Sequence, residues 1–216
     1  MLTAITFSAK TKRMKKSNSH YHHGHLAESL LDAVDEIATQ FGIEAVTLRG
    51  CAKRIGVSPA SAFRHYADKR SLLTVFATRA LNQLADSMET SMLQAQESGE
   101  DALQAVCMAY VRFALIKPAF FRAMWREEMI YSGDPDYLAA TQRLASYLQE
   151  GFVKTIADED PCDFSPQELL AWSTVHGLAC LFVDGPVAQE QNTEEKLSLA
   201  KTVLTQLTPV FAQQRS

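Results

Sequence analysis

The sequence has few cysteines, and no two of them are closely spaced. Its four cysteines, Cys51, Cys107, Cys162 and Cys180, are spread over a chain of 216 residues and form no CxxC motif. A chain of this length can bury enough apolar surface to fold without disulfides. We therefore exclude a disulfide-stapled secreted domain and a zinc site built on cysteine pairs, and we expect reduced, mostly buried thiols.

Long apolar runs and strand patterns are also missing. No apolar run approaches the roughly 18 residues of a membrane span, and the N-terminus lacks the basic-then-apolar order of a signal peptide. We therefore expect a cytoplasmic protein with no membrane partner. Helix formers dominate, and glycine and proline cluster at a few boundaries, so the predicted fold class is all-α.

Signatures of catalysis are absent as well. The sequence contains no Ser/His/Asp or Cys/His arrangement, no glycine-rich phosphate loop and no HExxH motif. The run HYHHGH, from His20 to His25, could hold a divalent metal, but no carboxylate or cysteine stands at ligand spacing. We therefore expect no enzyme activity, no metal and no cofactor.

The net charge of −4 conceals an uneven distribution. Residues 10–79 hold 12 lysines and arginines against 6 acidic residues, whereas residues 80–216 hold 9 against 19. A basic first part beside an acidic second part is typical of a DNA-binding head on a body that does not bind DNA. Residues 1–20 lack periodicity and are rich in lysine, which predicts a flexible basic arm or a solvated tail.

Two short helical patterns joined by a turn make up the stretch TLRGCAKRIGVSPASAFRHY. In the first pattern, Leu48, Ala52 and Ile55 recur at helical spacing, and Thr47 stands where an N-cap belongs. Gly56 follows at the position where the chain must leave the right-handed helical region.

The second pattern begins at Ser58, a capping residue, and Pro59, whose missing N–H costs nothing at the first helical position. It ends at Tyr66, which we expect to be an apolar anchor together with Ala62 and Phe63. Small hydrogen-bonding residues near its start would let the backbone approach base edges in a major groove. The stretch therefore predicts a helix-turn-helix, with a plain helical hairpin as the alternative.

With the residues that follow it, the stretch TLRGCAKRIGVSPASAFRHYADKRSLL resembles the DNA-binding signature of the tetracycline-repressor (TetR) family of bacterial transcription regulators. The resemblance is close over residues 21–80. It implies an N-terminal three-helix helix-turn-helix DNA-binding domain and a C-terminal helical ligand-binding and dimerisation domain. We expect a basic flexible arm at 1–20, the DNA-binding domain at 21–72 and the regulatory domain at 73–216.

The resemblance also implies which residues contact double-stranded DNA. Phosphates would lie at the helix N-termini near Thr47 and Lys69. Bases would be recognised by the small residues of the second helix and by Arg64, whose guanidinium suits guanine. Many relatives have tyrosine at the position of Phe63, so its phosphate contact is absent here. The predicted DNA-binding residues are Thr47, Ser58, Pro59, Ala60, Ser61, Arg64, His65 and Lys69.

Helical patterns continue along the rest of the chain. An apolar stripe runs from Leu26 to Phe41, and Gly42 follows it. A long helix opened by Asp68 has Val75 among its apolar positions and extends to Ser98. Further helices are predicted at about 100–116, 118–131, 135–157, 165–184 and 194–212.

Large, soft side chains are dense in this second part. Trp172, His176 and Gly177 match a Trp…His-Gly pattern that one TetR subgroup carries in its penultimate helix. The resemblance implies a pocket for a hydrophobic or aromatic molecule with one hydrogen-bonding group. Ordinary core packing is the competing interpretation. The predicted ligand-binding residues are Met108, Phe113, Phe121, Met124, Trp125, Trp172 and His176.

The last two predicted helices also carry an apolar face. The resemblance implies a homodimer in which two helices from each subunit form a four-helix interface. The predicted interface residues are Leu170, Leu178, Leu181, Leu204 and Leu207. The sequence thus predicts a dimeric repressor that binds an inverted-repeat operator and is released by a small effector. The alternatives are a helical regulator that responds to a protein partner, and a small metal carrier or enzyme that uses the His run.

Overall fold

The computed structural model describes residues 25–150 and 166–206. These two ranges are helical and contain no strand, which confirms the all-α class. The predictions for the basic arm at 1–20, for Cys162 and for Leu207 lie outside the described residues. The elements are α1 (Leu26–Phe41), η1 (Ile43–Ala45), α2 (Leu48–Arg54), α3 (Pro59–His65), α4 (Lys69–Ser98), α5 (Ala102–Ile116), α6 (Pro118–Met124), η2 (Glu127–Met129), α7 (Pro135–Glu150), α8 (Pro166–Val183) and α9 (Thr193–Thr205).

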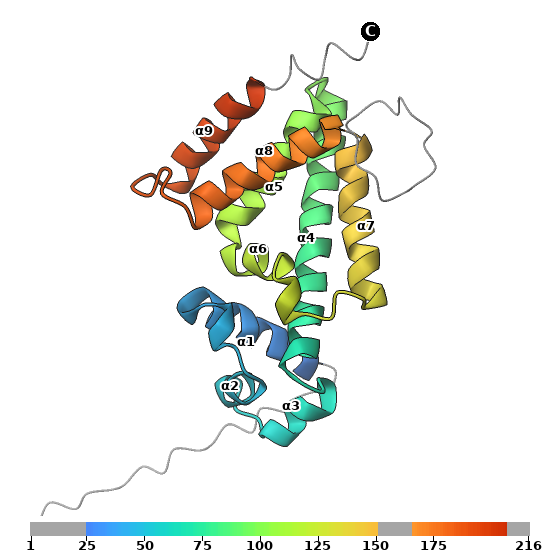
Figure 1. The fold of residues 1–216 in the computed structure, drawn as a ribbon, viewed down its shortest axis with the longest axis vertical. Coiled ribbons are helices and arrows are strands. Elements are labelled where there is room, and N and C mark those ends of the chain that lie inside the picture. Colours follow the sequence, from blue (N-terminus) through green and yellow to red (C-terminus); the bar gives the residue numbers. More distant parts are fainter. Residues whose placement is uncertain (1–24, 151–165, 207–216) are drawn as a thin grey trace, which may run out of the picture.

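Helix α4 is the axis of the molecule (Figure 1). Helices α1, α2 and α3 form a head around its first turns, and the remaining helices form a body along the rest of its length. In the body α4 packs against α5, α6 and α7, and α5 also packs against α8 and α9. One helix therefore belongs to both the head and the body, so a tilt of α4 would move α3.

Local capping chemistry sets the helix-turn-helix. The hydroxyl of Thr47 accepts a 3.0 Å hydrogen bond from the Gly50 N–H, which satisfies a free donor at the start of α2. The hydroxyl of Ser58 accepts a 3.2 Å bond from the Ser61 N–H in the same way. Between them Gly56 has a φ of 76°, the left-handed conformation that the turn requires. The predicted caps and turn are confirmed.

Three predicted core positions are instead exposed. Phe41 is the last residue of α1, Phe63 is 46% exposed on α3, and Val75 is exposed on α4. Helix α3 packs through Ala62, and Tyr66 just after its end shares that side, so Phe63 points about 100° away from the buried side. These three predictions of burial are wrong because the buried stripe of each helix is narrower than its apolar pattern.

The single helix predicted over 118–131 is also wrong. Helix α6 ends at Met124, and the short η2 follows. The N–H groups of Trp125 and Arg126 bond to carbonyls three residues back, at 3.4 and 3.5 Å, so the last turn tightens. The chain then turns towards the head, which gives the segment from Trp125 to Tyr131 a role that a continuous helix would not have.

Two further sequence predictions concern thiols and membrane spans. Cys51 and Cys107 are buried free thiols and Cys180 is a partly buried one. Among the described helices, no single one is long and apolar enough to cross a membrane. Helices α5 and α6 pass that test only together, and they are bent by 110° where they meet.

Candidate DNA-binding face and effector site

The exposed face of α3 gathers most of the residues predicted to contact bases. Pro59, Ala60, Arg64 and His65 are exposed, and Ser61 is half-buried. The hydroxyls of Ser58 and Ser61 lie 2.9 Å apart, and Arg64 donates a 3.0 Å hydrogen bond from Nη2 to Ser61 Oγ. The structure thus holds the Arg64 guanidinium close to the first turn of α3, where the helix N-terminus also favours anions.

The two residues predicted to hold phosphates are engaged differently. Thr47 is exposed, and its hydroxyl caps α2. The Lys69 ammonium donates a 2.8 Å hydrogen bond to the carbonyl oxygen of Glu44, so it joins the start of α4 to η1. An ammonium has three donors, so this bond leaves two of them for other acceptors. Arg49 and Lys53 on α2 are exposed as well, and they add positive charge that the predicted set omitted.

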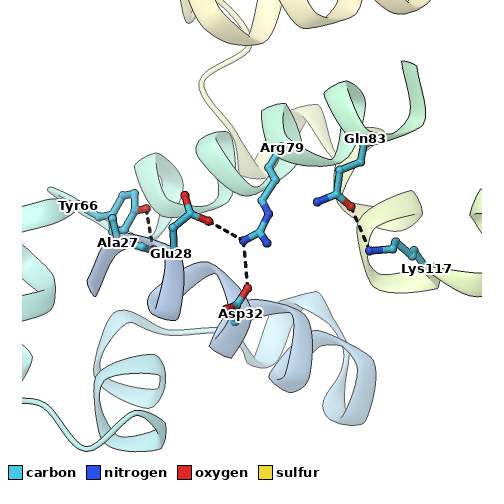
Figure 2. A network of polar contacts seen from close by, with 7 residues as sticks. All are labelled: Ala27, Glu28, Asp32, Tyr66, Arg79, Gln83 and Lys117. Carbon is cyan, nitrogen blue, oxygen red and sulfur yellow. Dashed lines mark hydrogen bonds and ion pairs between the residues drawn. The ribbon is translucent and has the colours of Figure 1, made fainter. Parts of the chain in front are cut away.

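Ion pairs and hydrogen bonds fix α1 of the head against α4 (Figure 2). Arg79 on α4 lies 3.2 Å from a Glu28 oxygen and 3.0 Å from an Asp32 oxygen, both on α1. The Tyr66 hydroxyl donates a 3.4 Å bond to the Ala27 carbonyl. Because Arg79 bridges two carboxylates, α1 is tied to α4 through a small network rather than a single exposed pair.

The segment after α6 forms a second connection between body and head. Tyr131 donates its hydroxyl hydrogen to Asp68 at 2.6 Å and its backbone N–H to Thr74 Oγ1 at 2.9 Å. Arg70 Nε donates to the Ile130 carbonyl at 2.7 Å, and Arg126 pairs with Glu44. These contacts all reach the first turns of α4 or η1. Sequence patterns could not find them, because the partners are 57 to 82 residues apart.

An aromatic cluster lies at the other end of that segment. The rings of Trp125 and Trp172 have centroids 5.7 Å apart, and Trp125 meets the His176 ring edge-on at 4.9 Å. The ring centroids of Phe121 and His176 lie 5.6 Å apart. Four of the seven predicted ligand-binding residues are therefore brought together by α6, its C-cap and α8.

The cluster also contains two residues that the sequence analysis missed. The hydroxyl of Tyr110, from α5, lies 2.9 Å from His176 Nδ1, and Cys180 Sγ lies 3.5 Å from His176 Nε2. Cys180 stands four residues after His176 on α8, a helical spacing that could have revealed it. Tyr110 gave no such signal, because its partner His176 is 66 residues away in the sequence.

Burial determines the protonation state of this cluster. It lowers the pKa of His176, and no charged side chain contributes to that shift among the described residues. Burial also raises the pKa of Tyr110, while the nearby indole N–H groups of Trp172 and Trp125 partly oppose the shift. The imidazole and the phenol are therefore both neutral at pH 7.

The other three predicted ligand-binding residues are placed differently. Met124 is fully buried, and Met108 is partly buried against the core. Phe113 packs its ring at 6.5 Å from Phe120 and lines a surface groove of about 370 Å³ between α4 and α5. None of the residues that line this groove belongs to the aromatic cluster around Trp125 and His176. Phe113 therefore packs with Phe120 and away from that cluster.

The predicted interface residues are divided between surface and core. Leu170 and Leu181 are exposed on α8, Leu178 is partly buried, and Leu204 is only 4% exposed. Leu204 is buried within the protomer, where α9 packs against α5, and its place in a dimer interface stays a prediction. A Cβ added at Gly177 would meet no atom within 4 Å, so the protomer itself does not require glycine there.

The histidine run is only partly described. His25 is the N-cap residue of α1 and makes no side-chain capping bond, whereas the other three histidines lie outside the described residues. Within 25–150 and 166–206, no group of three His, Cys, Asp or Glu side chains could hold a metal ion.

Two family models match this chain. The model of bacterial regulatory proteins of the tetR family matches residues 30–75, which span α1, the helix-turn-helix and the start of α4. The model of the tetracyclin repressor-like C-terminal domain matches residues 103–204. The chain belongs to the TetR family. It is thus a helix-turn-helix transcription regulator and not an enzyme, and the metal-carrier and enzyme alternatives are not favoured.

A curated relative supports this TetR assignment. An uncharacterised HTH-type transcriptional regulator of Bacillus subtilis (strain 168) is 32% identical over 94 residues. The match covers 44% of this chain and 48% of the relative, so the chain aligns with about half the length of that protein.

Solved structures with the TetR fold are similar over most of the chain. A protein of unknown function from Rhodococcus sp. RHA1 has a TM-score of 0.64 at 24% identity and covers 87% of this chain and 96% of its own. A TetR family transcription regulator from Marinobacter aquaeolei VT8 has a TM-score of 0.58 at 23% identity, covering 82% and 91%. A fatty acid degradation regulator from Bacillus halodurans has a TM-score of 0.58 at 14% identity, covering 84% and 93%. At these identities the likeness shows the fold alone.

Proposed function

We propose that this TetR-family regulator is a dimeric repressor that binds an inverted-repeat operator and is released by a small, hydrophobic effector. The effector would bind at the Trp125–His176 cluster, defined here as Tyr110, Phe121, Trp125, Trp172, His176 and Cys180. The protein would act in the cytoplasm, where its DNA lies. We also propose that the chain is divided into a basic arm at 1–20, a DNA-binding head at 21–72 and a regulatory body at 73–216.

One observation supports the coupling more than any other. Trp125 packs in the aromatic cluster, and the next residue, Arg126, pairs with Glu44 in the head. Five residues further on, Tyr131 is bonded to the N-cap of α4, directly after the recognition helix α3. A ligand that displaced Trp125 would therefore disturb the contacts that set the position of α4 relative to α3.

The energy that this switch needs is modest. A tenfold loss of operator affinity corresponds to about 1.4 kcal/mol of coupling, which is within the usual range for two-site systems. The effector can supply it only if it binds more tightly to the DNA-free arrangement of the heads. By reciprocity, saturating operator should weaken effector binding by the same factor.

The DNA-binding part of the proposal rests on the exposed face of α3. Ser58, Ser61 and Arg64 present donors and acceptors there, and the exposed cations Arg49 and Lys53 lie on the adjacent α2. Two such heads related by a two-fold axis would require half-sites in successive major grooves, about 34–36 Å apart.

Two experiments test the proposal. Selection from a random duplex library should return an inverted repeat, and a thermal-shift screen should return apolar compounds that also release the selected operator. Trp172→Ala should blunt that release more than it changes operator affinity without effector. Binders that stabilise the protein but leave operator affinity unchanged would contradict the switch, and selection without a consensus would contradict the repressor.

A further inference from the structure

The polar groups of the Trp125–His176 cluster define what kind of effector it can accept. Helices α5, α6 and α8 fix neutral hydrogen-bond donors and acceptors in this cluster, and each of them limits the chemistry of a bound molecule. The inference below rests on the proposed function, because it names the chemical class of the same effector.

Tyr110, His176 and Cys180 form a chain that satisfies its own hydrogen bonds. His176 is neutral, so only one of its ring nitrogens carries a hydrogen. If Nε2–H points to Cys180 Sγ at 3.5 Å, Nδ1 accepts the hydrogen of the Tyr110 hydroxyl at 2.9 Å. This tautomer pairs all three groups within the protein, so the imidazole is not left to bind a ligand group.

The indole N–H of Trp125 is different. Its Nε1 is buried and has no hydrogen-bond partner among the described residues. A buried N–H without an acceptor costs about 1–3 kcal/mol, so such groups are rare in folded proteins. The N–H lies near enough to the Tyr110 hydroxyl to affect its pKa, but the geometry is not that of a hydrogen bond. An oxygen acceptor brought by a ligand would remove this cost.

The charged side chains around the cluster limit the class of effector further. Among the residues that the structure describes, no charged side chain contributes to the pKa shift of His176. One acidic group affects the cluster among the described residues: burial raises the pKa of Cys180, and Asp184 raises it further. Asp184 is already paired with Arg122, with 2.6 Å between Arg122 Nη2 and Asp184 Oδ1. An ionised ligand would thus lose its hydration without gaining a free counter-ion from the described part of the chain.

We propose that the effector is an uncharged aromatic compound with a carbonyl-type oxygen, which accepts a hydrogen bond from Trp125 Nε1 and stacks its ring against Trp172. An aryl ketone, ester or quinone belongs to this class. A carboxylate, an ammonium compound and a pure hydrocarbon do not. The class follows from the unpaired donor, the neutral neighbours and the aromatic rings of one cluster.

The two tryptophans make the test direct. The chain has only Trp125 and Trp172, and both lie in the cluster, so intrinsic fluorescence reports binding at this site. Three probes of the same size are titrated: 4-tert-butylacetophenone, 4-tert-butylethylbenzene and 4-tert-butylbenzoate. They share a ring and differ in whether they offer a neutral acceptor, no acceptor or a charged acceptor.

We expect the ketone to bind about tenfold more tightly than the ethyl compound, the value of one good buried hydrogen bond. The benzoate should bind most weakly. Trp125→Phe, which keeps an aromatic ring but removes the N–H, should reduce the preference for the ketone to about twofold or less. Trp172→Phe is the matched control: it should weaken the three probes by similar factors and keep the preference.

A variant with 3-benzothienylalanine at position 125 replaces the N–H by sulfur at nearly constant ring size, so it repeats the test if Trp125→Phe folds poorly. Three results would overturn the proposed class: the benzoate binds most tightly, the preference for the ketone survives both changes at position 125, or no probe binds.

Operator titration separates this inference from the proposed function. Ketone-selective binding without DNA release would keep the ligand class and reject the switch.

Discussion

The hydroxyl of Tyr131 donates a 2.6 Å hydrogen bond to Asp68 Oδ2, while Asp68 Oδ1 accepts the Ser71 N–H at 2.7 Å. One carboxylate thus caps α4 and holds the segment that leads back to Trp125. Only three residues separate the end of α3 at His65 from the start of α4 at Lys69, so this carboxylate lies where α3 is joined to the body.

Replacing Tyr131 by phenylalanine should shift acid unfolding to higher pH. The Tyr131 hydrogen bond is the largest cause that lowers the pKa of Asp68, ahead of the Ser71 N–H. A carboxylate whose pKa is lowered in the folded state stabilises the protein above its unfolded pKa of about 4, and this stabilisation disappears as pH falls through the folded pKa. Tyr131→Phe should remove part of it.

Urea midpoints measured between about pH 2 and pH 6 check this prediction against the ordinary carboxyl pKa. Tyr137→Phe is a suitable control, because the Tyr137 hydroxyl donates to the Met124 carbonyl and not to a carboxylate. That variant should lose stability equally across this pH range. Identical pH profiles for Tyr131→Phe and the unmodified protein would show that the bond to Asp68 is not formed in solution.

Arg126→Gln should weaken the response to effector more than it weakens effector binding. Arg126 connects the residue after Trp125 to Glu44, so its loss should reduce the coupling by about 0.5–2 kcal/mol. The measurement is operator affinity with and without a saturating effector. Arg143→Gln is the matched control, since Arg143 pairs with Asp86 and Glu89 on α4 within the body. Equal coupling in the two variants would exclude a special role for Arg126.

Mild acid should destabilise the protein through His176. Burial lowers the pKa of His176 in the folded state, so between the unfolded value of about 6.5 and the folded value only the unfolded chain takes up the proton. Stability should therefore be constant above about pH 6.5 and fall as pH decreases below it. Thermal unfolding of His176→Gln should lack this slope. If the variant shows the same slope, another histidine is responsible.

The head was predictable because its signals are local. Thr47, Gly56 and Ser58 act within three residues of themselves, and the structure confirms each cap and turn. Contacts between distant segments leave no such trace: nothing near Tyr131 in the sequence points to Asp68, which is 63 residues away.

Which side chains of the body are exposed could not be predicted either, and the reason is different. Helix α8 is apolar on all sides, so periodicity does not say which side faces the core. Only packing separates the exposed Leu181 from the buried Val175 on the same helix. The same limit explains Leu204, whose apolar character fits an interface and a core equally well.

Arg64→Ala should change sequence preference rather than general affinity. If the guanidinium held by Ser61 contacts guanine, its loss should cost about 1–3 kcal/mol on the operator and relax the preference at one base pair per half-site. Deletion of residues 1–16 is the contrasting change, because a basic arm should strengthen binding to all sequences and steepen the dependence on salt. If Arg64→Ala leaves the ratio of operator affinity to random-DNA affinity unchanged, Arg64 contacts a phosphate and not a base.

A charge placed on the outer face of α8 should separate the subunits without unfolding them. Leu181 is 43% exposed in the protomer, so Leu181→Asp leaves the protomer core intact and buries an unpaired charge only if a second copy covers that face. Sedimentation should give a folded monomer. Leu138→Asp, at a similarly exposed leucine on α7, is the control and should remain a dimer.

Leu204→Asp completes the comparison, because Leu204 is 4% exposed and lies in the protomer core. A buried unpaired charge there should reduce helical content and the unfolding temperature, whatever the state of the dimer. Circular dichroism and sedimentation together distinguish the cases. A dimeric Leu181→Asp would remove the outer face of α8 from the interface, and a folded monomeric Leu204→Asp would return α9 to it.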